Sequence, residues 1–187
     1  MNKEHYLLAV SILMLSAVLT LTGCLVTVPG KVTGGGWMPS VSGMEKERAF
    51  FAFNADSCEG LDYARGHFNY RDKYATDFPR GVKMNGDVLE AYKCEEQASG
   101  TEGCYCDEAF EVPWHEIRVR YRSTDPKYPG EGEAIICMRD NGEGRNAVLA
   151  DTVFVQVWSG PYEGYENMGP VQGNIQSHEC EEVGDLR

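Results

Sequence analysis

The stretch Ile117-Arg118-Val119-Arg120-Tyr121-Arg122 alternates apolar and cationic side chains without a break. Successive side chains of a β-strand point to opposite faces, so this pattern predicts a strand with one buried face and one face in water. Residues 67–71 repeat the pattern, with Phe68 and Tyr70 as the apolar members. Half-buried strands of this kind are typical of antiparallel sheets, in which one face packs on the core.

Further strand segments recur along the chain. Residues 49–53 (AFFAF) form a short apolar run, residues 152–158 (TVFVQVW) are rich in β-branched side chains, and residues 134–138 and 171–178 are also expected to be strands. Residues 82–84 and 88–92 flank Asn85-Gly86, a pair that readily adopts positive φ, which predicts a hairpin turn. Seven or eight such segments, separated by Gly, Pro and Asn, predict an all-β fold, an antiparallel sandwich or barrel.

Length and charge restrict the class of protein. The 187 residues suit one domain behind a short leader, and 42% hydrophobic residues are enough for a globular core. Seventeen Lys and Arg against 29 Asp and Glu give a net charge of −12. This charge repels phosphate backbones, so we expect no nucleic-acid partner.

An uncharged apolar run lies near the start of the chain. Residues 7–22 (LLAVSILMLSAVLTLT) follow a segment that contains Lys3, Glu4 and His5. Sixteen residues are short for a membrane helix, which needs about 20, but they suit a secretory signal peptide. An uncleaved anchor over residues 6–29, which contain no charge, remains as the alternative.

The run ends in Leu21-Thr22-Gly23-Cys24, which resembles the lipobox of bacterial lipoproteins. The resemblance implies that residues 1–23 are removed as a signal peptide and that Cys24 is acylated through sulfur, as by palmitate. Each buried methylene contributes about 0.8 kcal/mol, so two or three acyl chains would hold the protein on its membrane. The expected location is the cell membrane or the outer membrane, facing away from the cytoplasm. Leu25 stands where an aspartate would resemble an inner-membrane retention signal, which favours the outer membrane in a cell with two.

Six cysteines remain after Cys24, and an even number in an exported chain predicts disulfides. Spacing alone does not choose among the fifteen pairings, but Cys104 and Cys106 are expected to take different partners, one of them Cys94. Metal binding through Cys104, Cys106, Asp107, Glu108 and His115 is the alternative, although the spacing does not match structural zinc sites. We therefore assign no metal or other cofactor. The candidate disulfide residues are Cys58, Cys94, Cys104, Cys106, Cys137 and Cys180.

Two motifs resemble the ends of a family of secreted bacterial β-modules, which typically read VTGGGW near the start and GNIQxH near the end. Here they are residues 32–37 and 173–178. The resemblance implies a module over residues 31–181 with Trp37 in its first strand, and it implies no reaction. Residues 24–30 would then be a lipidated tether, residues 93–112 a Cys-rich acidic insertion and residues 182–187 a tail.

Catalytic motifs are absent from the sequence. There is no G-x-S-x-G, phosphate loop or H-E-x-x-H, and the last pattern fails because Val119 follows His115-Glu116 where a histidine is required. His67, His115 and His178 are candidate bases only if carboxylates converge on them. We assign no catalytic residue, and an enzyme acting on an envelope glycan or other polymer remains the alternative.

Three surface features are candidate ligand sites. Arg118, Arg120 and Arg122 would form a cationic stripe for an anionic envelope polymer, unless neighbouring acids neutralise them. Trp158, Tyr162 and Tyr165 would stack on sugars if their rings are exposed, and would otherwise belong to the core. Residues 140–144 (DNGEG) could bind calcium, although turn chemistry accounts for the same residues. The sequence therefore predicts a lipid-anchored envelope module with a binding or structural role, whose partner is an envelope glycan or protein.

The lipid anchor is directly testable. In Cys24→Ala we expect the precursor to remain uncleaved and the protein to lose its lipid-dependent detergent partition, because the acylated sulfur is gone. Processing and partition by detergent phase separation measure both effects. Unchanged processing together with unchanged partition would refute the lipidation.

Overall fold

The computed structural model describes residues 24–60, 62, 64–97, 104–106, 114–142 and 149–180, without the side chains of 24–28 and 95–97. Strands are its regular elements, and the prediction of an all-β antiparallel fold is confirmed, with more strands than expected. No helix in these ranges is long and apolar enough to cross a membrane. The strands are β1 (Cys24–Pro29), β2 (Lys31–Pro39), β3 (Arg48–Asp56), β4 (Arg65–Asp72), β5 (Val82–Gln97), β6 (Trp114–Ser123), β7 (Glu131–Arg139), β8 (Thr152–Val157), β9 (Glu166–Pro170) and β10 (Gln172–His178).

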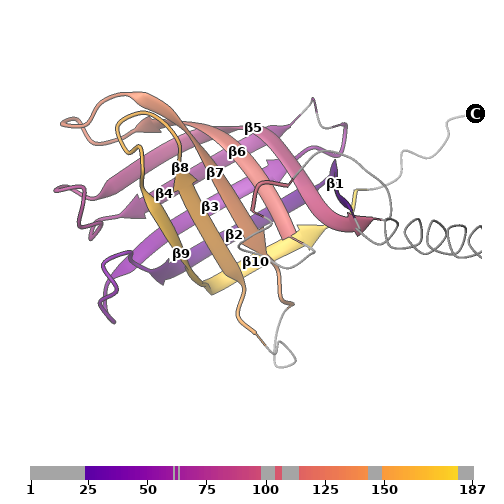
Figure 1. Ribbon diagram of the computed structural model, residues 1–187, viewed down its shortest axis with the longest axis horizontal. Helices are drawn as coiled ribbons and strands as arrows, with labels where there is room; N and C mark the ends of the chain where they lie inside the picture. The colour runs from indigo at the N-terminus through magenta and orange to yellow at the C-terminus, as the bar shows by residue number, and fades with distance from the viewer. Residues whose placement is uncertain are drawn as a thin grey trace, which may run out of the picture.

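The strands form one curved sheet that is nearly closed into a barrel (Figure 1). Its order is β10-β2-β3-β4-β5-β6-β7-β8-β9, and every neighbouring pair is antiparallel. Only Val171 separates β9 from β10, yet β9 pairs with β8 whereas β10 pairs with β2. One bent stretch of chain therefore joins the two ends of the sheet. The side chain of Asn167 reinforces this closure by donating to the Pro39 carbonyl of β2 at 3.0 Å.

Two side-chain carboxylates and one backbone carbonyl accept hydrogen bonds from N–H groups in β10 or just before it. β10 is a terminal strand of the sheet. The Asp151 carbonyl accepts from the Val171 N–H at 2.7 Å, and its carboxylate accepts from the Ile175 N–H at 3.0 Å. The Asp140 carboxylate accepts from the Ser177 N–H at 2.9 Å. Unpaired edge N–H groups are templates for pairing with another chain. These contacts therefore end the sheet without a further strand.

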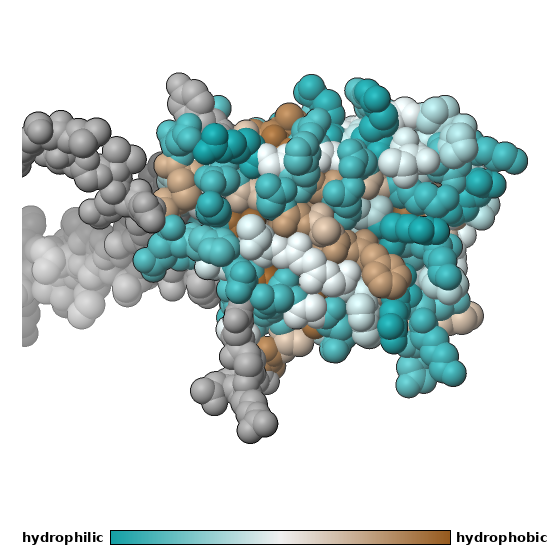
Figure 2. Space-filling view, turned by 180° about the vertical axis from the view of Figure 1, so that it is seen from behind, coloured by the Kyte–Doolittle hydropathy of each residue, from teal (hydrophilic) through white to brown (hydrophobic). Residues whose placement is uncertain are grey.

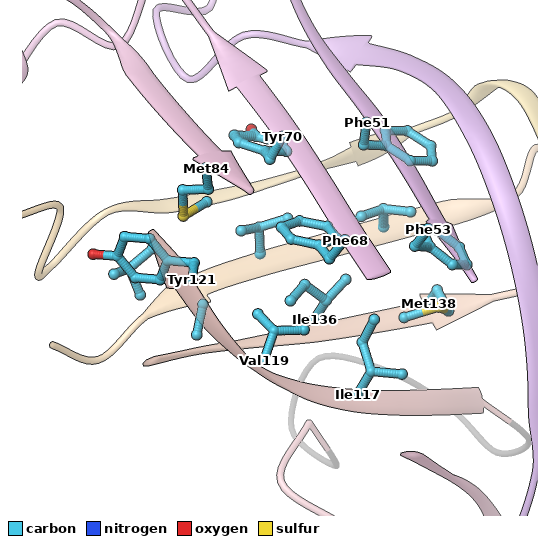
Figure 3. Close-up of a cluster of buried hydrophobic side chains, with 14 of the residues drawn as sticks. Phe51, Phe53, Phe68, Tyr70, Met84, Ile117, Val119, Tyr121, Ile136 and Met138 are labelled. Carbon is cyan, nitrogen blue, oxygen red and sulfur yellow. The ribbon is translucent and has the colours of Figure 1, made fainter. Parts of the chain in front are cut away.

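Large apolar side chains fill the interior. Figure 3 shows aromatic rings from β3 and β4 facing aliphatic side chains from β6 and β7. Burying one side chain of this size contributes roughly 1.5–3 kcal/mol, so this cluster dominates the stability of the fold. Its labelled members are Phe51, Phe53, Phe68, Tyr70, Met84, Ile117, Val119, Tyr121, Ile136 and Met138.

The hairpin predicted at Asn85-Gly86 is wrong, because both residues lie inside the continuous strand β5. Gly86 pairs with Phe68 of β4 and Tyr121 of β6. A Cβ atom at Gly86 would lie 3.1 Å from the Arg120 carbonyl oxygen and 3.4 Å from the Tyr121 Cβ. Close packing across the sheet therefore accounts for this glycine, which has no positive φ.

Two predicted segments contain strand residues. The expected tether over residues 24–30 contains β1, which pairs with Tyr92 to Gln97 at the end of β5. Residues 93–97 of the expected insertion belong to β5, which continues to Gln97. The predicted signal peptide (1–23), most of the insertion and the tail (182–187) lie outside the described residues.

The role of Asp151 at the sheet edge predicts a large stability effect. Asp151→Ala should lower the free energy of unfolding by roughly 2–4 kcal/mol, because two backbone N–H groups lose a charged acceptor. The control Asp140→Ala removes hydrogen bonds that are exposed to solvent and should cost under about 1 kcal/mol. Urea unfolding of the oxidised protein measures both, and equal losses would contradict this account.

Candidate functional site

The outer face of β3, β4 and β5 places side chains from distant parts of the sequence in rows. One row runs from Phe50 through Arg71 to Lys83, which are paired in register. The next row runs from Ala52 through Asn69 to Asn85. Because Ala52 is short whereas Phe50 and Arg71 are long, the surface is hollowed over Ala52.

A shallow groove of about 690 Å³ lies on this face and extends to Arg122 of β6. The charged residues that line it are Arg71, Lys83 and Arg122, and none of its described lining residues is acidic. Phe50 supplies an apolar wall and is 50% exposed. From behind, the molecule shows a band of apolar and neutral side chains bordered by hydrophilic ones (Figure 2). We call this groove, with the side chains of Phe50, Ala52, Asn69, Arg71, Lys83, Asn85 and Arg122 that line it, the outer groove.

Ion pairs distinguish the cations of the outer groove. Lys83 binds the buried Asp125 at 3.0 Å, and Arg122 binds Glu131 at 2.6 Å. The Lys127 N–H, together with Arg80 and Lys83, holds the pKa of the Asp125 carboxyl well below its usual range. Arg71 makes no ion pair with a residue that the structure describes. Its guanidinium is therefore the groove cation that is most available to a ligand.

Two amides complete the polar lining of the outer groove, and a cation-covered ring lies beside its apolar wall. Asn85 donates from Nδ2 to Oδ1 of Asn69 at 2.6 Å, which leaves a donor on Asn69 and an acceptor on Asn85. Beside Phe50 in register, the Trp37 ring is covered by the Arg48 guanidinium, 3.9 Å from the ring centroid. The groove thus offers hydrogen-bonding groups next to an apolar surface.

The predicted arginine stripe is largely neutralised. Arg118 pairs with Glu90 at 3.0 Å and with Glu133 at 3.6 Å, and Arg120 approaches Glu133 at 4.0 Å. Only Arg122 of the three also lines the outer groove. Acids on β5 and β7 therefore neutralise Arg118 and Arg120, which is the alternative to a cationic stripe that the sequence left open.

Two of the three candidate aromatic rings belong to the core, which is the alternative to sugar stacking that the sequence left open. Tyr162 and Tyr165 are buried, with hydroxyls bonded to Ser123 at 2.8 Å and to Asp72 at 2.9 Å. Burial raises the pKa of the Tyr165 hydroxyl. Trp158 is half-buried. It packs against Tyr105 with ring centroids 4.6 Å apart, and its indole N–H donates to Gln156.

The three candidate histidines lie in separate places among the described residues. His67 pairs with Asp87 at 2.9 Å in an exposed position, which does not fit the buried dyad that catalysis would need. His178 bonds Thr33 at 3.0 Å. His115 is buried, and its Nε2 lies 2.7 Å from the Ser177 hydroxyl. This last pair is the described arrangement closest to a nucleophile with its base.

All six remaining cysteines are joined in disulfides. The pairs are Cys58–Cys180, Cys94–Cys104 and Cys106–Cys137, with Cα atoms 5.2, 6.1 and 6.4 Å apart. Cys104 and Cys106 therefore have different partners, and one partner is Cys94.

Glu116 lies between two of these disulfides and is fully buried. Its carboxylate accepts hydrogen bonds from the backbone N–H groups of Tyr105 (2.9 Å) and Cys106 (2.7 Å). It also accepts from the Trp114 indole at 2.8 Å and the Tyr92 hydroxyl at 3.0 Å. Sequence reasoning missed this role, since the only sign of Glu116 was a failed zinc motif.

Disulfides and hydrogen bonds occupy the described residues that a metal or calcium ion would need. Two groups of atoms are close enough to hold a metal ion. In each, the sulfur atoms of a cysteine pair and an oxygen of Glu116 lie within 4.8 Å of one another. The cysteine pairs are Cys94–Cys104 and Cys106–Cys137, and both are disulfides. Of the other candidate metal ligands, His115 bonds Ser177, and Asp107 and Glu108 lie outside the described residues. In the predicted calcium loop, Asp140 accepts from the N–H groups of Gly142 and Ser177. Residues 143–144 lie outside the described residues.

No family model, curated protein or solved structure matches the chain. The geometry of the described residues therefore has to support any proposal of function.

The buried carboxylate of Glu116 generates a prediction. Glu116→Gln should lower the free energy of unfolding by roughly 2–4 kcal/mol, because the amide NH₂ meets donors where an oxygen accepted them. The control Glu131→Gln alters an exposed ion pair and should cost under about 1 kcal/mol. Urea unfolding of the oxidised proteins compares them. A Glu116→Gln variant as stable as the control would refute the role assigned to this carboxylate.

Proposed function

We propose that the chain is a lipid-anchored binding module of the cell envelope and that the outer groove is its binding surface. The anchor is the acylated Cys24, and the location is the cell membrane or the outer membrane, outside the cytoplasm. Six cysteines placed in three pairs support an oxidising compartment. The resemblance to secreted β-modules points to the same place.

The observation that carries the proposal is the contrast between the two faces of the sheet. The inner face is filled by apolar side chains, whereas the outer face has a groove with an exposed ring, two amides and cations. Convergent polar groups beside an apolar surface are typical of ligand sites. The groove is shallow and open to solvent, so a polymer can lie across it.

An enzyme acting on an envelope polymer is the second candidate, and one observation favours it. The Ser177 hydroxyl and His115 Nε2 are 2.7 Å apart, which is within range for a nucleophile and a general base. This pair lies on β10 and β6, away from the residues that line the outer groove.

The binding role is tested with the full-length lipidated protein in detergent micelles, on an array of envelope polysaccharides and proteins. We expect binding to at least one polymer, and Phe50→Ala should weaken it about tenfold, because the exposed ring is lost. Met168→Ala is the matched control, since Met168 is 49% exposed on β9, outside the groove.

Three results would count against this function. They are no binding to any polymer, equal losses in both variants, or release of sugar products that His115→Ala abolishes. The last would establish the enzyme instead.

A further inference from the structure

We infer that the ligand of the outer groove is an acidic polysaccharide, an extended sugar chain that carries carboxylate groups. This inference rests on the proposed binding function and names the class of ligand for the same site.

The local charge carries the first step. The chain has a net charge of −12, yet the charged residues that line the outer groove are all cations. At physiological salt the Debye length is about 8 Å, so a ligand in the groove responds to the nearest charges. Asp125 and Glu131 offset Lys83 and Arg122, whereas Arg71 has no acidic partner among the described residues. The groove therefore favours an anionic ligand in spite of the acidity of the whole protein.

The type of cation carries the second step. Arg71 lies at the centre of the Phe50–Arg71–Lys83 row and makes no ion pair with a described residue. A guanidinium binds a carboxylate through two parallel hydrogen bonds, which sets the orientation of the ligand. Lys83 and Arg122 are already paired with Asp125 and Glu131, so they attract an anionic ligand less strongly than Arg71 does.

The neutral groups of the groove indicate a sugar. Phe50 and Ala52 provide an apolar surface on which the hydrogen-bearing face of a sugar ring can lie. Asn69 and Asn85 provide the free donor and acceptor that hydroxyl groups require. A small inorganic anion would not use Phe50, Ala52 or the acceptor of Asn85.

The density of charge separates this ligand from a nucleic acid. Duplex DNA carries about one charge per 1.7 Å, whereas an acidic polysaccharide carries at most one carboxylate on each sugar. A groove with one available arginine, in a protein of net charge −12, matches the sparser polymer.

Binding to defined polymers tests the inference on the full-length lipidated protein in detergent micelles. The probes are polygalacturonate, its methyl-esterified neutral form and poly-L-glutamate, measured by biolayer interferometry. We expect polygalacturonate to bind at least tenfold more tightly than the other two. Raising NaCl from about 50 to about 500 mM should weaken the binding, because screening shortens the reach of the cations.

The variants Arg71→Gln and Arg65→Gln separate the groove from general charge. Both arginines are exposed on β4, about 20 Å apart along the strand, and each variant removes one positive charge. Arg71→Gln should weaken polygalacturonate binding about tenfold, whereas Arg65→Gln should change it less than twofold. Thermal unfolding verifies that both variants fold.

The outcomes distinguish the inference from the proposed function. Equal binding of the neutral and acidic polymers, or equal losses in the two variants, would overturn the acidic class while the binding role stands. Tighter binding of poly-L-glutamate would overturn the sugar. Failure to bind any of the three probes would overturn the inference. If the protein also binds no polymer on the wider array, the proposed binding function is refuted.

Discussion

The bend at Pro170 and Val171 is the constraint on which the rest of the structure depends. It lets one stretch of chain pair first with β8 and then with β2, so a meander with two distant ends becomes a nearly closed sheet. Closure encloses the inward side chains from all sides, which an open sheet of the same strands would not do. The carboxylates of Asp140 and Asp151 then satisfy backbone N–H groups of β10, which is the terminal strand of the sheet that the structure describes.

Closure also decides where a ligand can bind. Because the interior is occupied by aromatic and aliphatic side chains, the outer face is the surface on which polar and aromatic groups remain accessible. The strand register then determines which residues meet there. Phe50, Arg71 and Lys83 come from three strands, and only antiparallel pairing in this register places them in one row.

Alternation in the sequence was enough to predict the class of fold. The alternating residues of β4 and β6, and the β-branched run of β8, form strands where the pattern indicates them. Local patterns failed where packing across the sheet sets the residue type. Gly86 is required by its close approach to Tyr121 and forms no turn, and Tyr162 and Tyr165 lie in the core although they belong to the turn-rich segment between β8 and β9.

The candidate site was mostly hidden from sequence reasoning for the same physical reason. Phe50 lies within an apolar run, where nothing indicates that it faces outward, and the hollow beside it depends on the short side chain of Ala52. The pairing of Cys58 with Cys180 spans 122 residues, so spacing could not select it. Glu116 gave no signal because its four hydrogen-bond donors meet only after folding.

Hydroxyl-radical footprinting of the lipidated protein, with and without a bound polymer, tests the central claim most directly. Phe50, Met44 and Met168 are all exposed, so each is oxidised in the free protein. The account predicts that the polymer protects Phe50 while Met44 and Met168 react as before. Unchanged oxidation of Phe50 when the polymer is bound, with protection at Trp158 or Tyr105 instead, would contradict it.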